Sequence, residues 1–135
     1  MNFKTHRIAL ASLLSLALAG CANLQTKPED AVAQRATARW QALIKGDMDT
    51  AYKYSTPGYR AVIDVNGFKG RTGILGTWLD AQVYKVECDQ PDRCKVVLRL
   101  EFSTLIPGKS KLRMDTRLDE TWLLEDGQWW IFLQV

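Results

Sequence analysis

Residues 94–105 alternate between apolar and mostly charged side chains, and this pattern constrains the fold more than any other feature of the sequence. Val96, Leu98, Leu100 and Phe102 fall on one face, and charged residues fill most of the other, as in a half-buried β-strand. Three further strands are predicted at residues 78–88, 111–124 and 128–135. Turn residues separate them, including a Gly-containing hairpin at residues 125–127, so the C-terminal half is predicted to form a four-stranded antiparallel meander.

The N-terminal half predicts helices. A long helix begins at Pro28, whose acidic neighbours suit a first turn, and ends at Gly46. A shorter helix is expected at residues 48–54, and another helical turn or two at 59–65. Glycines at 67, 70, 73 and 76 predict a mobile loop over residues 66–76, without the Gly-Lys-Ser/Thr triplet of a phosphate-binding loop. Helices followed by a meander predict an α+β fold, with the helices packed on one face of a curved sheet.

The first 21 residues have the order of a signal peptide. Lys4 and Arg7 precede a twelve-residue apolar stretch, 8–19, which is shorter than the about 20 residues that span a bilayer. Leu18-Ala19-Gly20-Cys21 resembles the lipobox of bacterial lipoproteins. The resemblance implies a signal peptide at 1–20, a lipidated Cys21, a tether through residue 27 and a domain at 28–135. The alternative is an ordinary secreted protein that is cut nearby and retains Cys21 as a free thiol.

The same resemblance implies a location. Lipidation of Cys21 would anchor the chain, and Ala22, rather than Asp, after the cysteine favours the outer membrane, facing the periplasm. Cys88 and Cys94 would then lie in an oxidising compartment, with the turn-forming residues Asp89, Pro91 and Asp92 between them. They are predicted to form a disulfide across a hairpin. A metal site would need two more soft ligands, which the sequence does not offer.

Composition excludes several kinds of chemistry. The only histidine, His6, belongs to the signal peptide, so the mature domain has no Ser-His-Asp or Cys-His catalysis and no histidine metal ligand. Of 18 Lys and Arg residues, 16 remain after Lys4 and Arg7 are removed, against 15 Asp and Glu. The net charge of +1, without a long basic block, argues against a nucleic-acid partner. We expect no cofactor and no metal.

Two longer segments carry a further resemblance. ARWQALIKGDMDTAYKYSTPGYR (38–60) and ETWLLEDGQWWIF (120–132), with the strands between them, are similar to NTF2-like domains of the cystatin-like cone fold. The resemblance covers residues 30–135 and implies a curved sheet that wraps a long helix and leaves a cavity at its wide end. That fold hosts isomerases, dehydratases, hydrolases and non-enzymatic binding modules, so function must be argued from a site.

Glu120 is the strongest candidate in such a cavity, because it shares the apolar face of its strand with Leu118 and Trp122. It would act as an acid or base near Tyr52, Tyr54 or Tyr59, or be turned outward by a bulge, or be paired with Arg60 or Arg35. Asp64 and Asp80 are weaker candidates for proton transfer, and the alternative for both is a solvated position. Arg60 either binds a carboxylate or phosphate ligand or braces the junction between helix and loop. A small apolar ligand in the cavity is a further expectation.

The adjacent Trp129 and Trp130 predict an interaction surface. Successive side chains of a strand point to opposite faces, so one of the two tryptophans lies outside the core. With Leu123 and Phe132 it forms an apolar stripe, predicted to meet a second copy of the chain or another envelope protein. Cover by the N-terminal segment or by lipid headgroups is the alternative. Trp40, Trp78 and Trp122 are assigned to the core.

These features predict a membrane-tethered periplasmic binding or assembly module without catalytic activity. The absence of histidine and of a convergent acid–base set favours this function. The alternative is an NTF2-like cavity enzyme of the isomerase or dehydratase type. It would use Glu120, or one of the two aspartates, together with a tyrosine.

Overall fold

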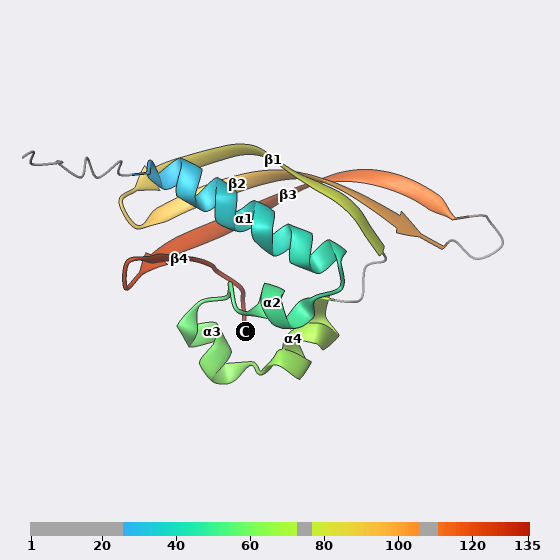
Figure 1. Ribbon diagram of the computed structural model, residues 1–135, viewed down its shortest axis with the longest axis horizontal. Coiled ribbons are helices and arrows are strands. Elements are labelled where there is room, and N and C mark those ends of the chain that lie inside the picture. Colours follow the sequence, from blue (N-terminus) through green and yellow to red (C-terminus); the bar gives the residue numbers. More distant parts are fainter. Residues whose placement is uncertain (1–25, 73–76, 106–110) are drawn as a thin grey trace, which may run out of the picture.

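The computed structural model describes residues 26–72, 77–105 and 111–135 (Figure 1). The predicted signal peptide, Cys21 and most of the tether lie outside the described residues. None of the helices in the described ranges has both the length and the apolar composition that crossing a membrane requires. The elements, in chain order, are α1 (Pro28–Ile44), α2 (Met48–Tyr52), α3 (Pro57–Val62), α4 (Val65–Thr72), β1 (Thr77–Gln90), β2 (Arg93–Thr104), β3 (Leu112–Glu125) and β4 (Gln128–Ile131). The predicted α+β class is confirmed.

The four strands form one antiparallel sheet in the order β1-β2-β3-β4, as the meander predicts. In the register of β2 and β3, Leu98 lies opposite Leu118, Val96 opposite Glu120 and Cys94 opposite Trp122. All of these positions share one face of the sheet, and α1 lies across that face (Figure 1). The helix contributes its own stripe to the core: Val32, Ala36, Trp40 and Leu43.

The β2–β3 hairpin extends beyond the end of α1 (Figure 1). As a result, the first half of the predicted apolar face of β3 is only partly covered: Leu112 is 45% exposed, Met114 43% and Leu118 39%. The second half is buried, with Glu120 and Trp122 under α1. The core therefore lies where α1 crosses the sheet. Most of its buried strand residues come from β2, and the others come from β3 and β4.

Strand β4 ends at Ile131, four residues before the predicted end at 135. Its outer edge is taken by the segment between α2 and α3. The Ile131 N–H donates to the Tyr54 carbonyl at 2.9 Å, and the Thr56 N–H donates to the Ile131 carbonyl at 3.2 Å. This covers a sheet edge that would otherwise be open to pairing with another chain. The Phe132 N–H still donates to the Thr121 carbonyl of β3 at 2.8 Å, and residues 133–135 follow outside the strand.

Two turns depend on glycine at positive φ. Gly46, with φ +76°, follows the end of α1, and Gly127, with φ +74°, follows Asp126 in the tight turn between β3 and β4. Both conformations are strained for a residue with a Cβ. Between α1 and α2, the Asp47 carboxylate accepts the Thr50 N–H at 3.1 Å, which caps α2 and lowers the pKa of Asp47.

The predicted loop at 66–76 is wrong for residues 66–72, which belong to α4; residues 73–76 lie outside the described residues. The Asp64 carboxylate caps this helix, accepting the Gly67 N–H at 2.8 Å. Phe68 is 1% exposed and packs its ring 5.6 Å from that of Tyr52. Each interior glycine disfavours a helix by about 1 kcal/mol, but the cap and the burial of a phenylalanine together outweigh that cost.

The predicted disulfide between Cys88 and Cys94 is confirmed. It joins β1 to β2 beside the hairpin turn, with the two Cα atoms 4.0 Å apart. Cys94 is fully buried against Trp122 of the next strand, its partner in the register. The bridge therefore anchors one end of the hairpin to the core.

Replacing Cys88 and Cys94 together by serine should lower the free energy of unfolding by about 2 kcal/mol and leave the fold intact. The short loop that the bridge closes limits the chain entropy that it removes from the unfolded state. Urea unfolding of the oxidised protein and of the double variant measures the difference. Two free thiols in protein purified from the periplasm, detected by alkylation and mass analysis, would contradict the disulfide.

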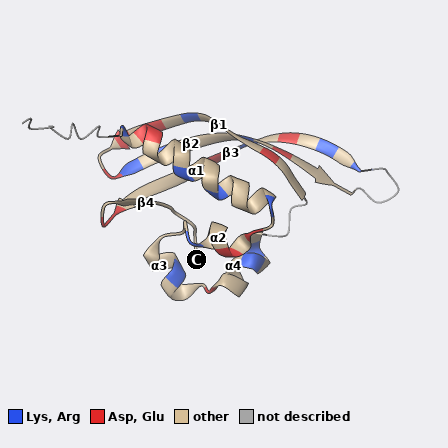
Figure 2. Cartoon of the chain, viewed as in Figure 1, with Lys and Arg blue, Asp and Glu red and all other residues tan. Residues whose placement is uncertain are grey.

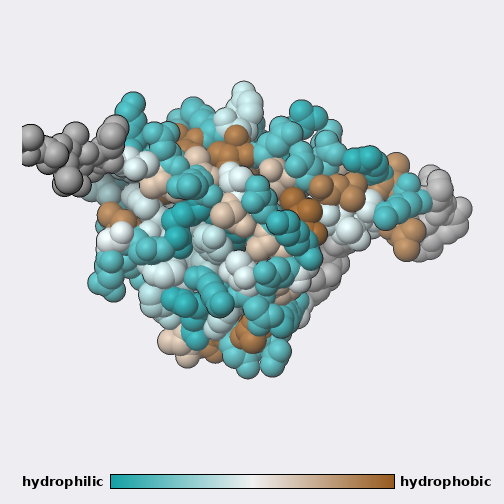
Figure 3. Space-filling view, in the orientation of Figure 1, coloured by the Kyte–Doolittle hydropathy of each residue, from teal (hydrophilic) through white to brown (hydrophobic). Residues whose placement is uncertain are grey.

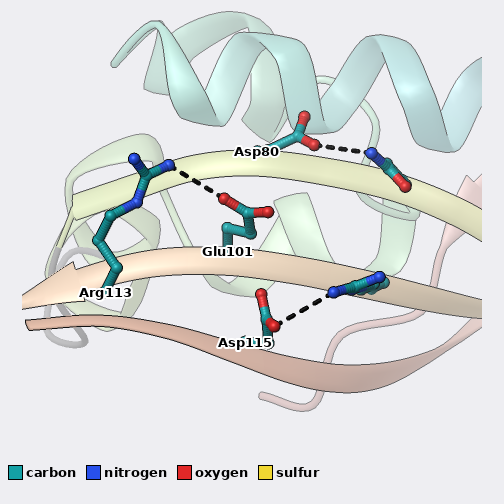
Figure 4. Close-up of polar contacts among 6 residues, drawn as sticks. Asp80, Glu101, Arg113 and Asp115 are labelled. Atoms are coloured by element: carbon teal, nitrogen blue, oxygen red, sulfur yellow. Dashed lines mark hydrogen bonds and ion pairs between the residues drawn. The ribbon is translucent and has the colours of Figure 1, made fainter.

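Charged residues recur along the projecting hairpin of β2 and β3 (Figure 2). Alternation with the buried Leu98 and Leu100 puts Arg99 and Glu101 on the face of the sheet away from α1. Arg113 pairs with Glu101 at 3.1 Å, and Arg99 pairs with Asp115 at 3.2 Å (Figure 4). All four side chains are partly exposed, and such pairs contribute little stability. This part of the sheet is therefore a solvated face with balanced charge.

Candidate functional site

The candidate site centres on the Glu120 carboxylate, which is 7% exposed between α1 and β3. Its Oε1 accepts hydrogen bonds from Arg39 Nη1 and from Trp40 Nε1, both at 2.8 Å. Its Oε2 accepts from Trp122 Nε1 at 3.0 Å. A buried carboxylate is thus satisfied by one guanidinium and two indole N–H groups.

Arg39 is the functional partner that the sequence prediction missed. Glu120 forms an ion pair with an arginine, which was one of the predicted alternatives. The arginine is Arg39, however, and neither Arg60 nor Arg35. Arg39 follows Val32 by seven residues and so lies on the buried stripe of α1. That helical spacing was the available signal, and it places a guanidinium directly over the inner face of β3.

The ion pair is shut off from solvent on both sides, with each side chain 6% exposed. Burial lowers the pKa of Arg39, and the charge and hydrogen bond of Glu120 oppose that effect. Arg39 Nε is buried without a hydrogen-bond partner in the described residues. A buried charge in such a place depends on its counter-charge, so removing either member of the pair should be costly.

A cavity of about 420 Å³ lies beside the pair. Glu120 and Arg39 form part of its wall, with Trp78, Arg71 and Phe132 further along the lining. Trp40 also lines it, and the ring centroids of Trp40 and Trp78 lie 5.2 Å apart in an edge-to-face arrangement. Among the described residues of this wall, Glu120 is the one buried carboxylate, and donors already engage both of its oxygens.

The two aspartate candidates lie elsewhere. Asp64 is exposed and caps α4, as described above. Asp80 lies on β1, where its carboxylate accepts from Gln82 Nε2 at 3.0 Å (Figure 4). Neither lines the cavity beside Glu120, so the structure does not bring the three predicted carboxylates together.

The tyrosines are also engaged in structural contacts. The Tyr52 hydroxyl donates to the Ile63 carbonyl at 2.8 Å, which ties α2 to the end of α3. Tyr59 is buried, and desolvation raises its pKa, so its phenol stays neutral. Among the described residues, no tyrosine is hydrogen-bonded to a carboxylate, and no cluster of His, Cys, Asp and Glu side chains could hold a metal.

The predicted interaction residues divide between the two faces of the sheet. Trp129 is buried, whereas Trp130 is half-buried and lies across from Leu123 in the register. Phe132 is 48% exposed. On the side of the molecule drawn in Figure 3, hydrophobic residues form separate groups among hydrophilic ones. The interaction surface stays a prediction, with Phe132 as its most exposed member.

Comparison with known proteins shows similarity of fold. No protein-family model matches the chain, and no curated protein matches it. A SEC-C motif containing protein from Psychrobacter arcticus is similar with a TM-score of 0.58 and 13% identity, covering 77% of this chain. This chain spans 59% of the length of that protein. A SEC-C motif containing protein from Rhodopseudomonas palustris has a TM-score of 0.53 and 16% identity, covering 73% of each chain.

A third solved structure is named as an NTF2-like transpeptidase from Campylobacter jejuni. Its TM-score is 0.45 at 15% identity, and the match covers 75% of this chain and 96% of that one. At these identities the likeness to the two SEC-C motif containing proteins concerns the fold alone.

Proposed function

We propose that this chain is a membrane-tethered binding or assembly module of the bacterial cell envelope, built on an NTF2-like cone and without catalytic activity. The observation that carries the proposal is the state of Glu120. It is the carboxylate best placed for chemistry in the cavity, and three donors already engage its two oxygens.

An enzyme of the isomerase or dehydratase type would need a different arrangement. A general acid or base must reach the substrate and exchange a proton with it. Glu120 instead holds α1 on β3, Tyr52 binds a backbone carbonyl, and Asp64 and Asp80 lie away from the cavity. These contacts are those of a scaffold, which favours binding over catalysis.

The membrane tether rests on the lipobox. Residues 22–27 separate Cys21 from the start of α1 and reach roughly 20 Å when fully extended. A lipid on Cys21 would therefore keep the domain close to the membrane surface, with the outer membrane as the proposed location. The Cys88–Cys94 disulfide agrees with an oxidising compartment such as the periplasm.

The binding function predicts a contact at Phe132, most simply with a second copy of the chain. A photo-reactive phenylalanine at position 132 of the native, lipidated protein should form a covalent adduct when cells are irradiated. An adduct of twice the mass of the chain would identify a homodimer, and another discrete mass would identify a different envelope protein. Denaturing gels and mass spectrometry of the adduct measure the outcome.

Position 115 provides the matched control, since Asp115 is exposed on the charged hairpin. The same probe there should give little or no adduct. Equal, diffuse cross-linking at both positions, or none at either, would argue against a specific partner on this face.

A further inference from the structure

A second pocket, separate from the Glu120 cavity, is lined by cations. It has a volume of about 440 Å³, within the range of small-ligand sites. Its lining residues come from α1, from α2, from the segment between α2 and α3, from α3 and from β4: Arg35, Thr50, Lys53, Tyr54, Arg60, Gln128 and Trp130. Three of the seven are basic, and no acidic residue is found among the described residues that line it.

The indole of Trp130 sets the positions of the two arginines. Its ring centroid lies 5.4 Å from Arg35 Cζ and 5.0 Å from Arg60 Cζ. Trp130 Nε1 donates to the Glu125 carbonyl at 3.2 Å, which fixes the ring. Cation–π contacts of this kind hold a guanidinium in place but leave its charge unneutralised.

Arg35 is further ordered by the backbone and by its neighbours. Its Nε donates to the Trp129 carbonyl at 2.6 Å, and Gln128, with its amide oxygen turned toward Arg35, accepts from both terminal nitrogens. Its guanidinium lies 4.8 Å from the Tyr54 ring centroid. Partial burial lowers the pKa of Arg35, so the site already bears a cost for holding this charge away from water.

The Arg60 side chain has an unsatisfied hydrogen-bond donor. Its Nε is buried and has no hydrogen-bond partner in the described part of the chain. The described carboxylates that form ion pairs are matched with other cations: Arg39, Lys69, Lys85, Lys95, Arg99 and Arg113. Arg35, Lys53 and Arg60 thus converge on one pocket, and none of the three forms an ion pair with a carboxylate of the described residues.

We propose that this pocket binds a phosphate monoester group, carried by a small molecule or by a lipid headgroup. Guanidinium groups match the geometry of phosphate oxygens, and a doubly charged anion suits three cations better than a single carboxylate does. The aromatic rings of Trp130 and Tyr54 would flank whatever carries the phosphate. The inference deepens the proposed binding function by assigning a ligand class to it.

Titration of the mature, lipidated protein in neutral detergent micelles tests the site, with tryptophan fluorescence as the readout. Inorganic phosphate and glycerol 3-phosphate should change the fluorescence saturably at constant ionic strength. Arg60→Gln should weaken binding about tenfold or more, because it removes a charged hydrogen-bond donor. Arg117→Gln is the matched control: Arg117 also lies over an aromatic ring, 5.4 Å from that of Tyr84, but outside this pocket.

Micelles doped with phosphatidic acid distinguish the two sources of the phosphate. A response to the soluble phosphates supports a small-molecule ligand, and a response confined to phosphatidic acid supports a headgroup. A change that is not saturable, or that is equal in wild type and Arg60→Gln, would overturn the site. That failure would leave the photo-adduct at position 132 unaffected, so it is distinguishable from failure of the binding module itself.

Discussion

Replacing Glu120 by alanine should lower the free energy of unfolding by about 3–5 kcal/mol, which is the usual cost of leaving a buried charge without its partner. The variant would strand the Arg39 guanidinium at 6% exposure and remove the acceptor from the indoles of Trp40 and Trp122. Each orphaned buried donor adds its own desolvation cost. A small domain has only about 5–15 kcal/mol of total stability, so much of this chain would unfold under mild conditions.

Glu120→Gln removes the charge of the side chain and keeps its shape, so it separates the two contributions to stability. The amide retains one oxygen, which can still accept from Arg39 and Trp40, but its NH₂ group would then face the N–H of Trp122. We expect a loss smaller than that of Glu120→Ala but well above that of a surface change. Asp115→Ala on the same strand is the control, since its pair with Arg99 is exposed and should be worth about 0–1 kcal/mol.

The double variant Arg39→Met/Glu120→Leu tests whether the unpaired charge of Arg39 causes the loss of stability. Replacing both charges with apolar groups of similar size removes the unpaired charge, so it should recover the part of the loss that this charge causes. The Trp40 and Trp122 N–H groups stay without an acceptor, so the part that they cause should remain. Urea unfolding midpoints of all four variants and the wild type give the comparison. A Glu120→Ala protein as stable as Asp115→Ala would mean that the pair does not hold α1 to β3.

The strands were predictable because alternation fixes which side chains face inward. Once Leu98 and Leu100 point to the core, a one-residue shift of β2 would expose both of them. The same argument assigns Glu120 to the inner face. The alternation cannot identify the residue that pairs with Glu120, because the pairing depends on where α1 crosses the sheet. That crossing is set by tertiary packing and not by the pattern of one strand. Arg39 can be identified only if a charged residue is accepted among the buried positions of α1.

The helix α4 was missed for a local reason. Glycines at 67 and 70 favour a loop, and nothing in residues 66–72 alone predicts that Phe68 is buried against Tyr52. The contacts on the outer side of β4 could not be predicted from local sequence either. Alternation requires that one of Trp129 and Trp130 leaves the core, but the contacts of Trp130 with Arg35 and Arg60 join three segments that are distant in sequence.

Replacing Cys21 by serine should abolish attachment of lipid altogether. The proposed modification joins lipid to the cysteine sulfur, and a serine hydroxyl is not an equivalent nucleophile. Without lipid, the lipobox resemblance implies no cleavage before residue 21, so the chain should remain a precursor that is 20 residues longer. Two or more acyl chains anchor a protein stably, whereas the twelve-residue apolar stretch, 8–19, is too short to span a bilayer. The variant should therefore be absent from the outer membrane.

Labelling with a radioactive fatty acid measures attachment of lipid, membrane fractionation measures location, and mass analysis of the N-terminus measures cleavage. The Cys88→Ser/Cys94→Ser variant is the matched control, because it also loses cysteines but keeps Cys21. It should incorporate lipid and fractionate as the wild type does, which would assign the lipid to Cys21 alone. If Cys21→Ser is still cleaved before residue 21 and found in the outer membrane at the wild-type level, the lipobox interpretation is wrong. The tether would then have to come from another part of the chain or from a partner.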